Sequence, residues 1–163
     1  MVKQVTFLLL IIFFANCSFA AAKELKISNY FFYESYIKPN NDLDGALGFQ
    51  ANLFLNKNVS FGILITGAAI GTRGGYGTAS LGLGYQIPLI ERFTNQTNIF
   101  IGAGGGKDVT AGGGLVLNLE TGLNYKLSNS LDLGARIGWL KFFNGLDLTF
   151  VNFGLIYNFI EVF

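Results

Sequence analysis

The sequence predicts an all-β protein, a closed antiparallel up-and-down transmembrane β-barrel of eight strands. Three observations predict this fold. Apolar residues alternate with small or polar residues along most of the chain, as they do in strands, whose successive side chains point to opposite faces. The small or polar set is mainly Gly, Ser, Thr, Asn and Gln, and charged residues make up only 13% of the chain. The alternating segments number eight, an even count that suits a closed membrane barrel.

The alternation is clearest between residues 115 and 127. Leu, Thr and Tyr occupy the odd positions, whereas the even positions carry Val116, Asn118, Glu120, Gly122, Asn124 and Lys126. Segment 97–104 is a weaker strand, and the first segment carries aromatic residues on both faces. The expected strands are 25–37, 45–55, 59–69, 76–87, 97–104, 112–127, 131–142 and 147–159.

The lengths of the connections test whether neighbouring strands share a face. The three residues 56–58 set Leu55 opposite Val59, and the three residues 128–130 set Leu127 opposite Leu131. Both pairs are apolar, as expected for directly opposed residues on one face. A two-residue turn at 144–145 would break the phase of the last strand, so we expect a bulge or a longer loop there.

The small and polar face decides between a membrane barrel and a soluble sheet, because alternation alone fits both. A face of Gly, Ser, Thr, Asn and Gln with few charges suits a narrow lumen, and Leu, Ile, Phe and Tyr then suit lipid. Lipid also requires closure, since an open edge would leave amides unpaired in hydrocarbon. Eight strands place both termini on the periplasmic side with the connections 56–58, 88–96 and 128–130, the second being long for such a turn. The expected extracellular loops are 38–44, 70–75, 105–111 and 143–146.

Residues 1–20 have the anatomy of a cleavable secretory signal peptide. Lys3 supplies the basic region, residues 7–15 are apolar, and Ser18 and Ala20 supply the small residues of a cleavage site. Cleavage after Ala22 is an alternative. The apolar run is too short to span a bilayer as a helix, and a lipoprotein acylated at Cys17 is disfavoured by the preceding Asn. The barrel domain is therefore expected over residues 21–163.

The end of the chain resembles the closing strand of Gram-negative outer-membrane proteins, which ends in alternating aromatics. Here Tyr157 and Phe159 stand in that pattern, although four residues follow and Phe163 is an alternative signature residue. In length and in the alternation of its successive segments, the expected mature chain is similar to the small eight-stranded barrels of the OmpA/OmpX type. The resemblance is architectural. It implies the cell outer membrane as the location, contact with outer-membrane lipid and lipopolysaccharide, and folding by the barrel-assembly machinery, with the protein a monomer.

Several function classes are excluded or disfavoured by composition. The chain has no histidine, which excludes Ser-His and Cys-His catalysis and His-ligated metals. A formal net charge of +1 gives no electrostatic footprint for nucleic acid. The glycine-rich residues 102–107 fail as a phosphate loop, because Ile101 and Asp108 occupy positions that need Gly and Ser or Thr. We expect no catalytic, cofactor-binding or metal-binding residues, and interpret the glycines as a bent hairpin.

Two sets of residues are the candidate sites. Glu34, Glu120 and Arg136 form an expected lumen charge cluster, in which Glu120 and Arg136 lie on the inward face of adjacent strands and compensate each other's buried charge. Its functional alternative is a conducting lumen or a gate, against structural plugging of an interior only wide enough for side chains. The expected aromatic girdle at the headgroups consists of Tyr33, Tyr85, Trp139, Tyr157 and Phe159, with Phe49 and Phe61 as further candidates.

The function predicted from these features is that of a non-enzymatic integral outer-membrane protein with a structural, envelope or surface-interaction role. A pore for small solutes is a subordinate version of this hypothesis. One alternative is a soluble secreted barrel that binds an apolar ligand as lipocalins do, which requires the apolar face to point inward. Another is a lipid A-modifying barrel enzyme. It is disfavoured because the families that this chain resembles in size use a histidine with a serine.

Overall fold

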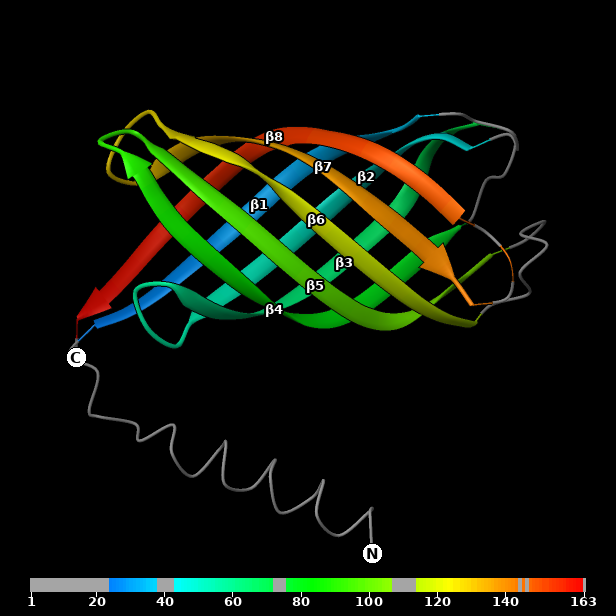
Figure 1. Cartoon of the computed structure of the whole chain (residues 1–163), viewed down its shortest axis with the longest axis horizontal. Helices are drawn as coiled ribbons and strands as arrows, with labels where there is room; N and C mark the ends of the chain where they lie inside the picture. Colours follow the sequence, from blue (N-terminus) through cyan, green and yellow to red (C-terminus); the bar gives the residue numbers. More distant parts are fainter. Residues whose placement is uncertain are drawn as a thin grey trace, which may run out of the picture.

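The structure, a computed structural model, describes residues 24–37, 43–71, 76–106, 114–143, 145 and 147–162. Each strand pairs antiparallel with the next, and β8 pairs with β1, so the sheet is a closed barrel (Figure 1). Within these residues no helix is long and apolar enough to cross a bilayer. The strands are β1 (Glu24–Ile37), β2 (Leu43–Phe54), β3 (Val59–Gly71), β4 (Gly77–Ile90), β5 (Phe93–Gly105), β6 (Gly114–Lys126), β7 (Leu131–Phe142) and β8 (Asp147–Val162). The predicted fold class is confirmed.

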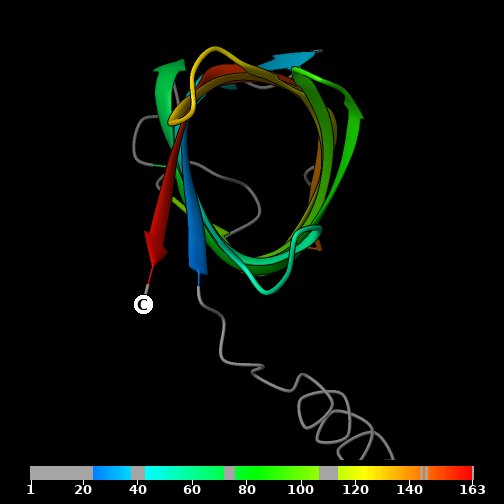
Figure 2. The ribbon, with the colours of Figure 1, turned by 90° about the vertical axis from the view of Figure 1, so that its left-hand side faces the viewer.

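The barrel has two distinct ends. The start of β1 and the end of β8 lie side by side at one of them, seen at the left of Figure 1 and facing the viewer in Figure 2. We call this the terminal end and the opposite one the loop end. The expected leader, residues 1–20, lies outside the described residues. So do residues 38–42, 72–75 and 107–113 and positions 144 and 146, which make up most of the expected extracellular connections.

Residue parity organises the whole barrel. Apart from two irregularities, on β2 near Gly45 and on β4 near Ile90, every strand pairing joins odd positions to odd and even to even. Because successive side chains alternate between faces, one parity faces inward all the way round. All the buried side chains are even-numbered, and all the exposed large hydrophobic ones are odd-numbered except Ile90. The alternation along the sequence therefore produces one continuous inner surface and one continuous outer surface.

Two of the terminal-end turns are closed by side-chain caps. Asn56 Oδ1 accepts hydrogen bonds from the backbone N–H groups of Asn58 (2.9 Å) and Val59 (2.8 Å). Ser128 Oγ accepts them in the same way from Ser130 (3.3 Å) and Leu131 (3.1 Å). Such Asx- and Ser-turns let the side chain replace a missing backbone partner. The predicted register at both turns is confirmed, since the Leu55 and Leu127 N–H groups bond the Val59 and Leu131 carbonyls.

The long connection expected at 88–96 is wrong. β4 continues through Pro88 to Ile90, only Glu91 and Arg92 form the turn, and β5 begins at Phe93. The pairing shifts between Pro88 and Ile90, and a bulge is one of the few places where a strand accepts proline. The same shift explains why Ile90 is exposed despite its even number. At the other irregular turn the expected longer loop is confirmed, because residues 143–146 separate β7 from β8 and Gly145 adopts a φ of 122°.

Candidate functional site

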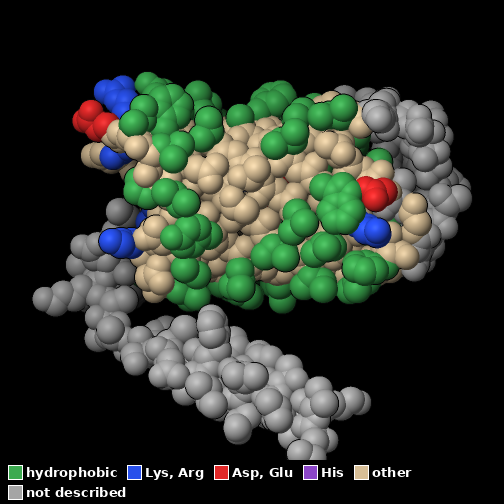
Figure 3. All heavy atoms as spheres, viewed as in Figure 1, with side chains coloured by type: hydrophobic (Ala, Val, Ile, Leu, Met, Phe, Trp, Pro, Cys, Tyr) green, Lys and Arg blue, Asp and Glu red, His purple; other side chains and the backbone are tan. Residues whose placement is uncertain are grey.

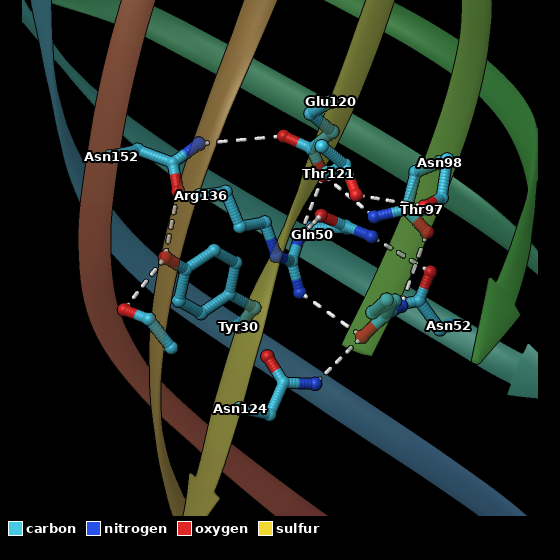
Figure 4. A network of polar contacts seen from close by, with 12 residues as sticks. Tyr30, Gln50, Asn52, Thr97, Asn98, Glu120, Thr121, Asn124, Arg136 and Asn152 are labelled. Carbon is cyan, nitrogen blue, oxygen red and sulfur yellow. Dashed lines mark hydrogen bonds and ion pairs between the residues drawn. The ribbon is translucent and has the colours of Figure 1, made fainter. Parts of the chain in front are cut away.

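The middle of the lumen holds a hydrogen-bonded network centred on Arg136 of β7 (Figure 4). Its guanidinium Nη1 lies 2.6 Å from Glu120 Oε1 on β6 and also donates to Gln50 Oε1 of β2, while Nη2 donates to Gln96 Oε1 of β5 at 3.2 Å. The Arg136 Cζ atom also stacks 4.1 Å from the centre of the Tyr30 ring. The Arg136 side chain thus links β7 to the adjacent strand β6, to β5 beyond it, and across the lumen to β2.

Amides extend this network to further strands. Asn98 Nδ2 donates to Glu120 Oε1 (2.7 Å), and Asn152 Nδ2 of β8 donates to Glu120 Oε2 (3.4 Å). The Tyr30 hydroxyl of β1 donates to Asn152 Oδ1 at 2.8 Å. We call the set the Arg136 network; its other members bond through Gln50 and Gln96 and are Asn52, Ser28 and Asn124. Charge-assisted bonds of this kind compensate the cost of burying Glu120 and Arg136, which are 3% and 4% exposed.

Glycines make the room that these large side chains occupy. A Cβ atom on Gly122 would lie 2.6 Å from Arg136 Cα and 2.7 Å from Arg136 Cγ. A Cβ on Gly134 would lie 2.9 Å from a Tyr30 ring atom. Both glycines are even-numbered and inward, next to the residue that covers them. The high glycine content therefore reflects a lumen in which a large side chain lies over a glycine of the adjacent strand, as Arg136 does, or of the strand beyond it, as Tyr30 does.

An apolar cluster fills the lumen toward the loop end. Its members come from the last residues of β1 and β7, the first residues of β2, β6 and β8, and the residue before β4. They are Tyr36, Ala46, Tyr76, Val116, Leu140, Phe142, Leu148 and Phe150, and all are buried. We call this cluster the apolar plug. On the terminal-end side of the plug, the Arg136 network spans six strands. The apolar plug and this polar network therefore form two layers of side chains inside the barrel.

Glu34 lies inside the lumen but outside the Arg136 network. It is 1% exposed, and among the described residues neither carboxylate oxygen has a hydrogen-bond partner. Its register neighbours are Ala46 and Asn152, and the buried hydroxyl groups of Tyr36 and Tyr76 are likewise without a hydrogen-bond partner in the described part of the chain. Of the three residues of the predicted cluster, the structure thus brings Glu120 and Arg136 into an ion pair and leaves Glu34 between the network and the apolar plug.

The expected aromatic girdle residues lie near both ends of the outer surface. Tyr85 pairs with Val59, the first residue of β3, and Tyr157 pairs with Leu131, the first residue of β7, so both lie toward the terminal end. Phe159 packs on Tyr157 with ring centres 4.5 Å apart. In contrast, Tyr33 and Trp139 lie toward the loop end: Trp139 pairs with the third residue of β8, and Tyr33 is four positions from the end of β1. That they anchor the barrel at headgroups stays a prediction.

Sequence reasoning missed an aromatic pair and most of the Arg136 network. Phe93 and Tyr125 pair on β5 and β6 with ring centres 4.9 Å apart, but Phe93 had been assigned to a connection. Gln96 also falls within the expected connection 88–96, and for Gln50, Asn98 and Asn152 the pattern predicts only that they lie on the inner face. Their even parity was visible, yet their mutual contacts depend on the register of every strand, which the sequence alone did not fix.

The outer surface carries many apolar side chains, with backbone and uncharged polar side chains between them on the face shown in Figure 3. Leu47, Phe153, Ile137 and Leu81 are each more than half exposed, and Lys, Arg, Asp and Glu side chains appear near the two ends in this view. A soluble barrel with an apolar ligand site needs the reverse arrangement. The structure therefore contradicts the lipocalin-like alternative. Among the described residues no group of three His, Cys, Asp or Glu side chains gathers as a metal site.

Several solved structures share this architecture. The N-terminal β-barrel domain of Pseudomonas aeruginosa OprF matches with a TM-score of 0.66 at 14% identity, covering 84% of this chain and 98% of that one. The fold is that of the small outer-membrane barrels. P. aeruginosa outer membrane protein H, OprH, matches with a TM-score of 0.61 at 10% identity over 82% of this chain and 99% of that one.

A third similar structure is Ail, the attachment invasion locus protein of Yersinia pestis, with a TM-score of 0.54 and 14% identity over 83% of this chain and 98% of that one. No protein-family model matches the chain, and no curated protein is detectably similar in sequence. At these identities the likeness shows the fold alone, so function has to be argued from the residues.

Proposed function

We propose that this protein is a non-enzymatic integral outer-membrane barrel with a structural role in the envelope. The observation that carries the proposal is the filled lumen beneath an apolar outer wall. The Arg136 network and the apolar plug occupy the interior, and eight strands leave room for little more than side chains. The surface that remains for function is the outer wall together with the connections at the loop end.

Location and folding are tested by expressing the full chain in a Gram-negative host and separating the two membranes by density. We expect the protein in the outer-membrane fraction, and we expect an unboiled sample to migrate differently from a boiled one, since a closed barrel resists the detergent. Protein in the periplasm or medium that stays soluble without detergent would contradict the proposal. The mass of the purified protein tests cleavage after Ala20 in the same preparation.

The filled lumen is tested by recording current across planar bilayers. We expect little conductance, because the Arg136 network and the apolar plug would have to move aside for an ion to pass. The matched control is an open barrel of larger strand number, recorded under the same conditions. Steady current from the wild-type protein would favour the pore hypothesis.

The proposed partners are outer-membrane lipid, lipopolysaccharide and, during folding, the barrel-assembly machinery, with the protein a monomer. Folding by the barrel-assembly machinery is supported by the alternation of Tyr157 and Phe159 on the outer face of β8. Replacing both by Ala should slow assembly and lower the folded fraction in cells, whereas replacing the outward Phe93 and Tyr125 of β5 and β6 should affect it less. Equal effects of the two pairs would contradict a special role for the closing strand.

The absence of enzymatic activity is also a proposal. It rests on the lack of histidine in the sequence and on the commitment of Glu120 and Arg136 to each other. Mass spectrometry of lipid A from cells with and without the protein tests it. Identical acyl chains are expected, and a difference in acylation would contradict the proposal.

A further inference from the structure

A groove of about 630 Å³ runs across the outer face over β4–β7. Its walls are apolar side chains, chiefly Leu83, Tyr85, Ile99, Leu119, Ile137 and Trp139. Figure 3 shows this face, where a tan strip of backbone and uncharged polar side chains crosses the middle between green apolar ones. The groove is thus a hollow in the apolar wall, with an aromatic residue toward each end of the barrel.

The floor of the groove is formed by two threonines that satisfy each other. Thr97 of β5 and Thr121 of β6 are directly opposed in the register, and their hydroxyl oxygens are 2.8 Å apart. Their neighbours on the outer face are larger, so the wall is low here. Because each hydroxyl is already paired, the floor does not need a polar occupant, and leaving it against hydrocarbon costs little.

The loop-end limit of the groove carries charge. The Lys141 ammonium lies 5.5 Å from the centre of the Trp139 ring, and the Trp139 indole N–H donates to the Asp147 carboxylate. Lys141 and Asp147 oppose each other across β7 and β8. The Asp147 carboxylate thus accepts a hydrogen bond from the Trp139 indole. The Lys141 ammonium beside that indole is the cation on β7 nearest to this end of the groove.

We propose that this groove binds a membrane lipid that carries phosphate in its headgroup: one acyl chain lies over Thr97 and Thr121 between Tyr85 and Trp139, and the phosphate of the same lipid binds Lys141. The inference rests on the proposed outer-membrane location. It is supported by the continuity of the groove with the lipid-facing wall and by the complementary charges of phosphate and ammonium. A second barrel would present a convex wall that cannot fill a hollow, whereas a flexible chain can.

The protein carries its own reporter, because Trp139 is its one tryptophan and lines the groove. The full chain is reconstituted into phosphatidylcholine vesicles that contain a small fraction of lipid with brominated acyl chains, which quench a nearby indole. The brominated lipid is either phosphatidylglycerol or a phosphate-free galactosyl diglyceride. We expect phosphatidylglycerol to associate about fivefold more strongly, as one lysine near a membrane surface contributes ~1 kcal/mol.

Two variants separate the headgroup from the chain. Lys141→Gln should remove the preference for phosphatidylglycerol, with Lys57→Gln in an exposed turn as its control. Thr97→Leu combined with Thr121→Leu should fill the groove and lower quenching by both brominated lipids at low fraction, while the wall stays compatible with lipid. Ala79→Leu, which places a leucine on the outer face of β4 away from the groove, is the matched control.

Failure of the lipid site is distinguishable from failure of the membrane location. Strong quenching in fully brominated vesicles shows that Trp139 faces lipid. Given that result, equal association of the two lipids, or a preference unchanged by Lys141→Gln and by groove filling, would overturn the site alone. Cross-linking that captures a second copy through the groove would overturn it as well. No quenching even in fully brominated vesicles would overturn the membrane location together with the site.

Discussion

The two buried glutamates of the lumen stand in opposite circumstances. Glu120 accepts hydrogen bonds from Arg136, Asn98 and Asn152, whereas neither oxygen of Glu34 has a hydrogen-bond partner within the strands and turns that the structure describes. Both are inward, even-numbered and almost fully buried. The difference shows that facing the same lumen does not make two carboxylates equivalent, because the partners at each level of the barrel decide what burial costs.

Asn152 explains how the division arises. It lies directly opposite Glu34 in the pairing of β1 with β8, so it is the nearest amide in the register. Its Nδ2 donates to Glu120 and its Oδ1 accepts from Tyr30. Glu34 is thus next to a donor that the Arg136 network already uses, and on its other side begins the apolar plug.

The largest expected effect on stability comes from removing Glu120, the glutamate whose hydrogen bonds and charge are satisfied. Glu120→Ala leaves Arg136 as a buried cation without its counter-charge, which should destabilise the barrel by about 3–5 kcal/mol. Urea unfolding in lipid vesicles, followed by Trp139 fluorescence, measures this. Glu91→Ala in the exposed turn between β4 and β5 is the control, and should change stability by less than about 0.5 kcal/mol. Similar small effects for both variants would mean that the ion pair contributes little.

A somewhat smaller effect should follow from crowding Arg136 without touching its charge. On Gly122 a new methyl group would meet Arg136 Cα and the Ala135 backbone carbonyl, and backbone atoms cannot swing aside. Gly122→Ala should therefore destabilise the barrel by about 1–3 kcal/mol, as overpacking does. The matched control is Gly67→Ala, where the nearest atom lies at an ordinary 3.8 Å. Comparable unfolding curves for the two alanine variants would rule out the tight fit.

Glu34→Gln should shift stability in the opposite direction. The amide removes the cost of burying a carboxyl group that has no partner, whether that cost comes from an unpaired charge or from the uptake of a proton, so we expect a gain of about 1–2 kcal/mol. The same substitution at Glu120 should cost stability, because there the charge is compensated. The same Glu→Gln substitution is therefore expected to raise stability at position 34 and to lower it at position 120, which tests the comparison most directly. A loss of stability at both sites would show that Glu34 has a partner in solution.

Parity made the fold predictable, whereas the contacts within the lumen were not. Leu55 and Val59, like Leu127 and Leu131, reveal the register because short turns leave no freedom in how the strands pair. Pro88 misled, since proline more often ends a strand than sits beside a bulge. For Glu34 the parity indicated the inward face, but its isolation depends on Asn152, a residue more than a hundred positions away that meets it only when β8 closes on β1.

The smallest expected effect is the coupling between the two glutamates, and Asn152 is its predicted carrier. In Glu120→Gln the amide of Asn152 loses its charged acceptor, so it can turn toward Glu34, its register neighbour. Glu34 would then be better satisfied, and adding Glu34→Gln should stabilise the barrel less than it does in the wild type. A double-mutant cycle on urea unfolding should give a coupling of about 0.5–1 kcal/mol. Repeating the cycle with Asn152→Ala in all four proteins should reduce the coupling toward zero. If the coupling persists without Asn152, direct repulsion between the two carboxylates carries it instead, and the amide is only a bystander between them.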